Sequence, residues 1–242
     1  MAAVSSFVID ENDLEPIQDD GDTASVYIAF DAANGCERLE QRVIRFGPGR
    51  SVERTLAGQQ EVLYIVAGRG QLHVDGNTHE LEPNMGVYLA PGETYAVENP
   101  GPHDLHVLSV IAPEDRAAAS GERKVTVRFD DQPELEASVE RSFRYLVNED
   151  AGCFDVTQFL GIVQPSKAPF HSHTYDEVGY IVAGEGIAHV GGAEFPLKTG
   201  SCFHLPPDEV HCIENTGSAP LRILGVFHPS GSPANRTYVD NK

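Results

Sequence analysis

Several residue types are scarce in this 242-residue chain, and the scarcities exclude some classes of partner. There is no Trp and there are only 2 Met. Basic residues are few, because 17 Lys and Arg stand against 37 Asp and Glu, which gives a net charge of -20. Nucleic acids and anionic membrane surfaces are bound by clustered basic faces, so neither is expected as a partner.

Long hydrophobic runs and paired cysteines are missing too. No stretch of about 18 consecutive apolar residues occurs, so no membrane-spanning helix is predicted. The opening MAAVSSFVIDENDLEP has no basic stretch followed by an apolar core, and a cytoplasmic protein is expected. The four cysteines, Cys36, Cys153, Cys202 and Cys212, form no C-x-x-C pair, so we expect buried free thiols rather than a zinc knuckle or a redox motif.

Glycine and proline, by contrast, are frequent. The 23 Gly and 16 Pro punctuate a chain whose hydrophobic fraction of 40% is sufficient for buried cores. Such punctuation favours many short strands joined by turns over long helices. The length fits either one large β domain or two smaller ones.

An internal repeat decides between these two organisations. The segment EVLYIVAGRGQLHVDG, which starts at Glu61, matches EVGYIVAGEGIAHVGG, which starts at Glu177, at an offset of 116 residues. Roughly 17 of about 45 positions agree around this segment, too many for an unrelated pairing. We therefore predict two copies of one β domain, at residues 1–120 and 121–242, with the polar stretch PEDRAAASGER from Pro113 as the linker.

Each copy is predicted to consist of short strands that form an all-β barrel or sandwich. Matching strands are expected at 64–67 and 180–183, 71–74 and 187–190, 86–90 and 202–206, and 105–111 and 221–227. Asp75-Gly76 and Gly191-Gly192 are typical hairpin turns. The segment ELEASVERS at 134–142 is predicted to form a short helix.

The second copy contains a group of potential metal ligands. His171 and His173 lie two apart, so on a strand both side chains point to the same face. A turn over 174–176 can bring in Glu177 from the next strand, and His211 follows the turn Pro206-Pro207-Asp208. Three imidazoles and one carboxylate suit a divalent transition metal such as Fe, Mn, Ni or Zn better than Ca or Mg.

The first copy provides an internal control on this group, because clustered surface histidines are the alternative explanation. Thr55, Ala57 and Tyr95 stand opposite His171, His173 and His211, and only Glu61 persists, opposite Glu177. The fold therefore does not need these histidines, and their joint presence in the second copy indicates a metal site. Glu177 is the least secure of the four ligands, since its counterpart persists without any histidine.

The same comparison assigns roles to other side chains. His73 and His189 occupy equivalent positions and are expected to be structural, while Tyr64 and Tyr180 are expected in the core. Other residues near the ligands in sequence are ambiguous: His204 could line the pocket, Tyr175 and Asp176 could reach a substrate, and Cys212 is expected to point away from it.

These motifs resemble those of the cupin superfamily, and specifically of bicupins. His171-x-His173-xxx-Glu177, followed by six residues and then Gly184, is similar to the first cupin motif, although Gln164-Pro165-Ser166 stands where that motif begins with glycine. Gly200, Pro206, His211 and Asn215 match the second motif, with Asp208 in place of a glycine. This departure alters a turn and not a ligand.

The resemblance implies two tandem jelly-roll-like cupin barrels with one divalent transition metal per chain, held in the C-terminal barrel only. It also implies a metal-dependent enzyme on a small organic acid or polar metabolite, with dioxygenase-type chemistry first and isomerisation or decarboxylation close behind. Glu177 is the candidate catalytic base. A non-catalytic metal-bearing binding protein, or a metal that only stabilises the fold, are the alternatives, and a homodimer is possible. Fold alone does not choose among these functions.

Overall fold

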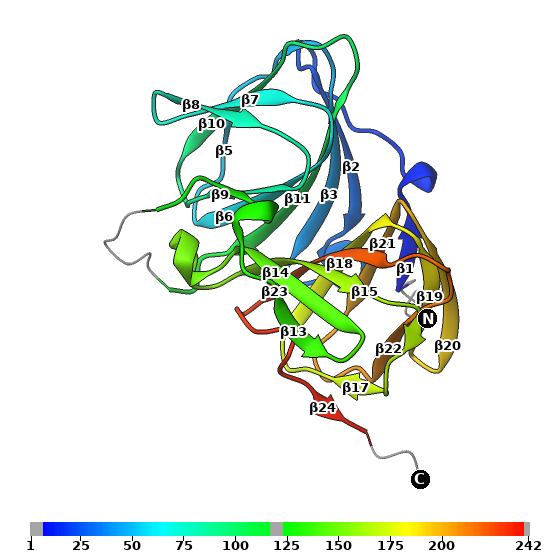
Figure 1. The fold of residues 1–242 in the computed structure, drawn as a ribbon. Helices are drawn as coiled ribbons and strands as arrows, with labels where there is room; N and C mark the ends of the chain where they lie inside the picture. The colour runs from blue at the N-terminus through cyan, green and yellow to red at the C-terminus, as the bar shows by residue number, and fades with distance from the viewer. Residues whose placement is uncertain (1–6, 117–122, 240–242) are drawn as a thin grey trace.

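The computed structural model describes residues 7–116 and 123–239, and strands dominate it (Figure 1). The strands form two barrels of jelly-roll type, each made of a large and a small antiparallel sheet. Helical structure in the described part of the chain is confined to four short 3-10 turns, η1 (Glu11–Asp13), η2 (Ala32–Asn34), η3 (Phe129–Asp131) and η4 (Glu149–Ala151). The predicted all-β class with two tandem cupin-like barrels is confirmed.

The first barrel packs a six-stranded sheet against a smaller one. The large sheet has the order β12 (Thr126–Arg128), β9 (Met85–Leu89), β6 (Gln59–Ala67), β11 (Leu105–Pro113), β3 (Glu40–Phe46) and β2 (Ala24–Phe30). The small sheet has the order β4 (Gly49–Arg50), β10 (Thr94–Asn99), β7 (Gly70–Val74) and β8 (Asn77–Leu81), with β5 (Arg54–Thr55) beside β10.

The second barrel repeats this plan with one more strand in its large sheet. The large sheet has the order β1 (Val8–Asp10), β21 (Ser201–Leu205), β18 (Asp176–Ala183), β23 (Leu221–His228), β15 (Thr157–Val163), β14 (Arg141–Val147) and β13 (Leu135–Ser138). The small sheet has the order β20 (Ala193–Lys198), β19 (Glu185–Val190), β22 (His211–Asn215), β17 (His171–Ser172) and β24 (Thr237–Tyr238), with β16 (Ser166–Lys167) beside β22.

The two barrels exchange strands. β1, from the first half of the chain, pairs with β21 in the large sheet of the second barrel. β12, which follows the linker, pairs with β9 in the large sheet of the first barrel. Each large sheet therefore includes residues from both halves of the sequence. The predicted boundary between residues 120 and 121 lies outside the described residues.

The large sheets pack against each other, so that both of their faces are buried. One core cluster fills the interface between them and includes Tyr64, Leu108, Tyr180 and Leu224. Separate clusters fill the first barrel, around Ile65 and Val97, and the second barrel, around Ile181 and Ile213. This double burial is why the central strands are almost continuously apolar rather than alternating, and it confirms the expected core positions of Tyr64 and Tyr180.

The helix predicted at 134–142 is wrong. β13 and the start of β14 occupy this segment and form a hairpin at the edge of the large sheet, with β14 hydrogen-bonded to β15. Pairing with an existing sheet edge satisfies the backbone groups that a helix would satisfy internally. Phe143 packs into an aromatic cluster of the second barrel with Ala137 against it, so tertiary contacts overrode the local helical propensity.

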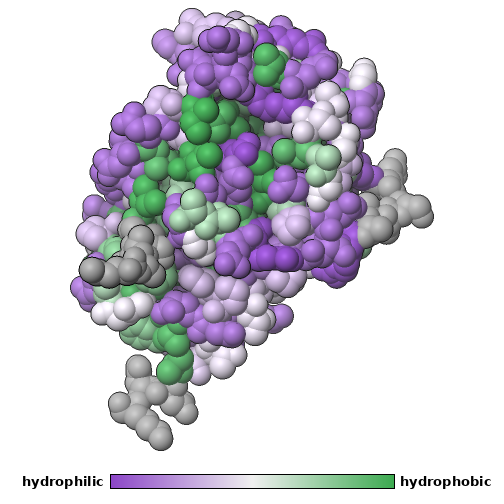
Figure 2. Space-filling view, turned by 180° about the vertical axis from the view of Figure 1, so that it is seen from behind, coloured by the Kyte–Doolittle hydropathy of each residue, from purple (hydrophilic) through white to green (hydrophobic). Residues whose placement is uncertain are grey.

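Polar side chains cover most of the face drawn in Figure 2. Hydrophobic side chains on this face gather in the upper half of the view, over the first barrel. Exposed apolar patches of this kind can mark contact surfaces between proteins, and the expected homodimer remains a prediction. No helix within the described ranges has the length and apolar character needed to cross a bilayer.

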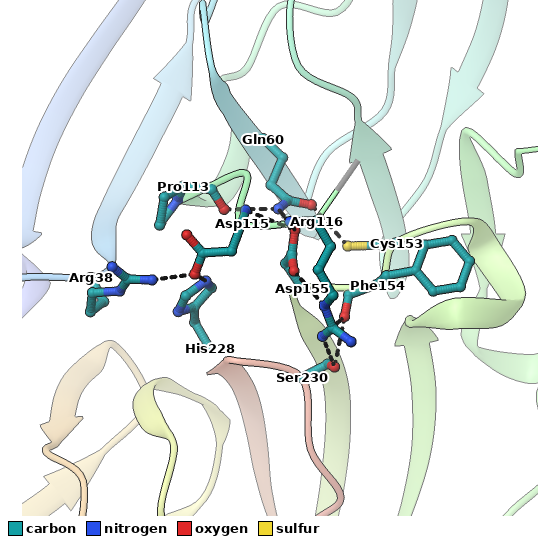
Figure 3. Close-up of polar contacts among 10 residues, drawn as sticks. All are labelled: Arg38, Gln60, Pro113, Asp115, Arg116, Cys153, Phe154, Asp155, His228 and Ser230. Atoms are coloured by element: carbon teal, nitrogen blue, oxygen red, sulfur yellow. Dashed lines mark hydrogen bonds and ion pairs between the residues drawn. The ribbon is translucent and has the colours of Figure 1, made fainter. Parts of the chain in front are cut away.

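The carboxylate of Asp155 holds the linker against both barrels (Figure 3). Its Oδ2 accepts hydrogen bonds from the backbone N–H groups of Asp115 (3.1 Å) and Arg116 (3.0 Å), and from Nε2 of Gln60 on β6 (3.3 Å). Its Oδ1 accepts from Nε of Arg116 at 2.9 Å. Burial by itself would raise the pKa of Asp155, but these donors from Arg116, Asp115 and Gln60 hold it below its usual value.

Replacing Asp155 with Ala leaves two backbone donors and a guanidinium without their acceptor. We expect the free energy of unfolding at pH 7 to fall by about 2–4 kcal/mol, measured by urea denaturation. Because the pKa of Asp155 is lower in the folded state, its contribution exists at neutral pH and is lost as the pH falls below about 4. The difference in the free energy of unfolding between wild type and Asp155→Ala should therefore become smaller at acidic pH. An equal effect of Asp150→Ala, at an exposed neighbouring position, would contradict this role.

Candidate metal centre

Three strands of the second barrel deliver the predicted ligands to one place. His171 on β17 pairs directly with His211, the first residue of β22. His173 follows β17, and the chain turns before β18 brings in Glu177. The turn before His211 contains Asp208 with φ of 63°, a left-handed conformation that Asp tolerates better than most residues. Its N–H donates to the carbonyl of His173 at 2.7 Å, so Asp208 fulfils the glycine's role in this turn and ties the two ligand segments together.

The four side chains line one buried cavity. They are 7%, 6%, 8% and 2% exposed, in the order His171, His173, Glu177 and His211. Ligand atoms of His173, Glu177 and His211 all lie within 4.8 Å of one another. His171 lies beside this group, with its ring centroid 4.5 Å from that of His211.

Backbone carbonyls fix the tautomer of each imidazole. Nδ1 of His171 faces the carbonyl of Pro169 at 3.0 Å, Nδ1 of His173 faces that of Tyr175 at 2.9 Å, and Nδ1 of His211 faces that of Glu209 at 2.8 Å. A carbonyl oxygen can only accept, so each Nδ1 carries the proton and each Nε2 presents a lone pair. A hydrogen bond from the other ring nitrogen to a backbone carbonyl is typical of metal-binding histidines.

The charge state of the group also suits a cation. Burial, together with neighbouring histidines, lowers the pKa of His171 to about 3 and that of His211 to about 4, so both are neutral at pH 7. Burial would lower the pKa of His173 as well, but the hydrogen bond and charge of Glu177 raise it. Nε2 of His173 is 2.8 Å from Oε2 of Glu177. Nδ1 of His173 already donates to the carbonyl of Tyr175. Nε2 of His173 and Oε2 of Glu177 would therefore face each other as two lone pairs unless a proton or a metal ion lies between them.

Aromatic rings and two arginines complete the cavity wall. Phe143, Phe159, Tyr175 and Phe227 form a cluster next to the ligands, and Arg141 and Arg236 reach the cavity from β14 and the C-terminal segment. Within the described part of the chain, neither guanidinium pairs with a carboxylate. The cavity volume is about 90 Å³, room for several water-sized groups when one water needs roughly 10–15 Å³.

The C-terminal segment is held over this cavity by Tyr175. The ring of Tyr175 stacks on His173, with centroids 4.3 Å apart, and on Phe227, with centroids 4.1 Å apart. Its hydroxyl donates to the carbonyls of Ser232 (2.8 Å) and Asn235 (2.9 Å). Tyr175 therefore lines the cavity as expected, but its hydroxyl positions the segment that carries Arg236.

In the first barrel, Glu61 occupies the position of Glu177, but the positions of the three histidines hold other residues. The hydroxyl of Tyr95 donates to Oε2 of Glu61 at 2.7 Å, and the hydroxyl of Ser109 donates to Oε1. Burial raises the pKa of Glu61, and these two donors oppose that rise. Both carboxylate oxygens of Glu61 are thus satisfied by protein donors.

In the second barrel both of these donors are absent. The position of Tyr95 is taken by His211, and that of Ser109 is taken by Gly225. A Cβ at Gly225 would lie 3.2 Å from Oε1 of Glu177 and would clash with Phe159 at 2.3 Å. Glu177 has therefore lost the donors that satisfy its counterpart and faces imidazole nitrogens instead. This exchange strengthens Glu177 as a cation ligand beyond what the sequence alone indicated.

Other candidate residues lie elsewhere. Asp176 and His204 point to the opposite face of the large sheet, where they bind each other at 2.7 Å, so the expectation that they reach the pocket is wrong. His73 and His189 each bind an equivalent glutamate, Glu98 at 2.9 Å and Glu214 at 2.8 Å, as structural residues would. All four cysteines are buried and free. Arg141 and Arg236 were not predicted, since no motif marks a hairpin edge or a C-terminal segment.

Comparison with known proteins supports the fold and the repeat. A family model described as cupin domain matches twice, at residues 42–111 and 159–227. An oxalate-binding protein of Thermotoga maritima is 39% identical over 63 residues, which is 26% of this chain and 52% of that protein. An uncharacterized protein of Methanocaldococcus jannaschii is 38% identical over 65 residues, with the same coverage. The chain thus spans about half the length of the curated relatives it matches.

Solved structures extend the likeness to both barrels. Oxalate decarboxylase of Bacillus subtilis, a protein with Mn(II) centres, superimposes with a TM-score of 0.76 at 14% identity, over 99% of this chain and 81% of that one. Protein Ylba of E. coli superimposes with a TM-score of 0.78 at 14% identity, over 96% of this chain and 95% of that one. At such identities the likeness shows the fold alone.

The first barrel supplies fold-compatible substitutions that test the metal ligands. His173→Ala and His211→Tyr introduce the residues found at those positions in the first barrel, and removing ligands weakens metal binding strongly. After dialysis against Fe(II), Mn(II), Ni(II) or Zn(II), we expect the double variant to bind about one ion per chain fewer than wild type, measured by elemental analysis. His189→Asn, outside the cavity, should bind as much as wild type. Equal metal in the double variant and wild type would contradict the assignment.

Proposed function

The chain belongs to the cupin family, and from this premise we propose that it is a metal-dependent enzyme that acts on a small carboxylic acid. The observation that carries the proposal is the donor set in the second barrel: three imidazoles whose Nδ1 atoms are held by backbone carbonyls, and a glutamate that lacks the two hydroxyl donors of its counterpart Glu61. His171, His173, Glu177 and His211 would hold one divalent ion. That ion would supply a Lewis acid, or a site for O2 if it is iron.

Two arginines support a carboxylate as substrate. Arg141 lies in the cavity wall with one N–H donating to the carbonyl of Ile213, and Arg236 approaches from the C-terminal segment. Both arginines line the same cavity as His171 and His211, so their guanidinium charges act near the ligands. Arginines bind carboxylates through paired, charge-assisted hydrogen bonds. Among the described residues, these arginines donate to the carbonyls of Ile213 and Pro233 and to no carboxylate. In a chain with a net charge of -20, two such cations at one cavity support an anionic ligand.

The remaining residues would orient the substrate and control its protons. The phenylalanines around the ligands exclude water from the reacting group, which strengthens every electrostatic interaction there. Among the described residues of the cavity wall, Glu177 is the only one with a carboxylate, and it is the candidate base. Dioxygenase-type cleavage is the reaction class that we rank first from the motif resemblance. The likeness to oxalate decarboxylase makes decarboxylation a direct competitor, and isomerisation is the third class.

Measurement of two gases separates these classes. Protein reconstituted with Fe(II), Mn(II), Ni(II) or Zn(II) is presented with small mono- and dicarboxylic acids, oxalate included, while O2 uptake and CO2 release are followed. Dioxygenase chemistry consumes O2, decarboxylation releases CO2 without net O2 uptake, and isomerisation does neither but changes the acid. Turnover that disappears in the His173→Ala/His211→Tyr variant supports the proposal.

Absence of turnover overturns the enzymatic proposal, and a binding measurement then decides what replaces it. Saturable, metal-dependent binding of an acid without turnover supports the alternative of a non-catalytic binding protein, which the oxalate-binding relative favours. Metal that raises only the melting temperature, with no binding of any acid, supports a structural metal.

The arginines give a second, independent prediction. Arg141→Gln or Arg236→Gln should raise KM, or Kd for a binder, by at least tenfold for a carboxylate ligand, since a hydrogen bond to a charged group contributes about 1.5–3 kcal/mol. Metal content should stay at the wild-type level, because neither residue is a ligand. Arg128→Gln, on the first barrel where Arg128 pairs with Glu82, is the matched control. An unchanged KM in both cavity variants would show that the carboxylate binds elsewhere.

A further inference from the structure

A second group of ligand-type side chains lies on the opposite face of the sheet that carries Glu177. Cys36, Asp176 and His204 offer ligand atoms that all lie within 4.8 Å of one another. They are 1%, 5% and 3% exposed. Cys36 comes from the first half of the chain, while Asp176 and His204 lie on β18 and β21 of the second barrel. The group therefore spans the interface between the barrels.

Local structure places each member firmly. Cys36 follows η2, where Gly35 takes a left-handed conformation with φ of 96° and lets the chain turn back toward the interface. The N–H of Cys36 donates to the carbonyl of Asp31 at 2.9 Å. Asp176 faces the interface because it directly precedes Glu177, and successive side chains on a strand point to opposite faces. Nε2 of His204 is 2.7 Å from Oδ1 of Asp176, and its ring packs 5.7 Å from that of Phe30.

The pseudo-symmetric position at the same interface shows what packing alone requires. There Cys153 follows η4 and Gly152, and it meets Gln60 and Tyr88 of the first barrel, the counterparts of Asp176 and His204. The thiol of Cys153 donates to Oε1 of Gln60 at 3.2 Å and also interacts with Tyr88. Three neutral groups, a thiol, an amide and a phenol, thus pack together at this pseudo-symmetric position. The fold does not need a carboxylate and an imidazole beside the other thiol.

We propose that Cys36, Asp176 and His204 form a second metal site that joins the two barrels and takes zinc or another thiol-binding divalent ion. Thiolate, imidazole and carboxylate groups all bind zinc in proteins, and a thiolate selects softer metals than the cavity ligands do. The wall of the cavity around Glu177 includes none of the three side chains, and all three are buried, so the site suits a structural ion rather than a substrate. Without an ion, burial and the charge of Asp176 raise the pKa of Cys36 to about 12. Forming the sulfur–metal bond therefore releases one proton to solvent.

Cobalt(II) distinguishes this site from the cavity site, because only a thiolate ligand gives a sulfur-to-cobalt charge-transfer band in the near ultraviolet. We expect this band in the wild-type chain loaded with Co(II), together with about two Co or Zn ions per chain. Cys36→Ser should abolish the band and remove one ion. The His173→Ala/His211→Tyr variant should keep the band, so failure of the cavity site and failure of this one give different results.

Two further variants control for folding and for thiols in general. Cys153→Ser changes the pseudo-symmetric thiol and should leave the band intact. Asp176→Gln/His204→Tyr introduces the residues of the other position and should lose the band while the cavity ion is retained, which also shows that the variant is folded. A wild-type chain without the band, or a band that survives Cys36→Ser, would overturn the proposal and leave Asp176 and His204 as a hydrogen-bonded pair.

Discussion

Burial of both faces of the large sheets is the constraint on which the rest of this structure depends. Consecutive residues on a central strand point to two different buried regions, one inside a barrel and one between the barrels. A charged side chain on such a strand must find its partner within the protein, since an unpaired buried charge is strongly unfavourable. Glu61 meets this need with Tyr95 and Ser109. Asp176 and Glu177 stand side by side in sequence, yet each serves a separate group of ligands.

The two barrels differ at several positions around Glu61 and Glu177, and these differences act together. His173 and His211 bring nitrogen ligands to a place where the first barrel has Ala57 and Tyr95. Gly225, in the place of Ser109, frees a carboxylate oxygen of Glu177. A carboxylate whose two oxygens accept from hydroxyl groups is thus replaced by one that faces imidazole nitrogens, that of His173 at 2.8 Å. The side chains of His173, Glu177 and His211 point into the barrel cavity, while the core residues Tyr64 and Tyr180 between the barrels are the same in both copies.

The sequence was sufficient to predict the repeat, the main hairpins and the four residues that line the cavity. Each of these depends on local spacing: turn glycines, alternation along a strand, and ligands two or four residues apart. The hairpin at 135–147 was missed because its pairing with β15 is tertiary and its local composition favours a helix. Arg141 and Arg236 could not be predicted either, since they come from segments far apart in the chain. His204 was left as a candidate for the pocket because alternation along a strand shows which residues share a face, but not which of the two faces lines the cavity.

Strand exchange gives the molecule the topology of a two-fold dimer whose subunits have been joined end to end. β1, from the first half of the chain, completes a sheet of the second barrel, and β12, from the second half, completes a sheet of the first. Each half therefore contributes a strand to the other barrel. In a dimer of identical subunits, every substitution occurs twice, and a metal site gained or lost in one barrel is gained or lost in both. Fusion removes this coupling. In the fused chain, the glutamate of one barrel can be hydrogen-bonded by hydroxyl groups while the equivalent glutamate of the other barrel is available to a cation. The interface between the barrels can likewise hold different side chains at its two equivalent positions.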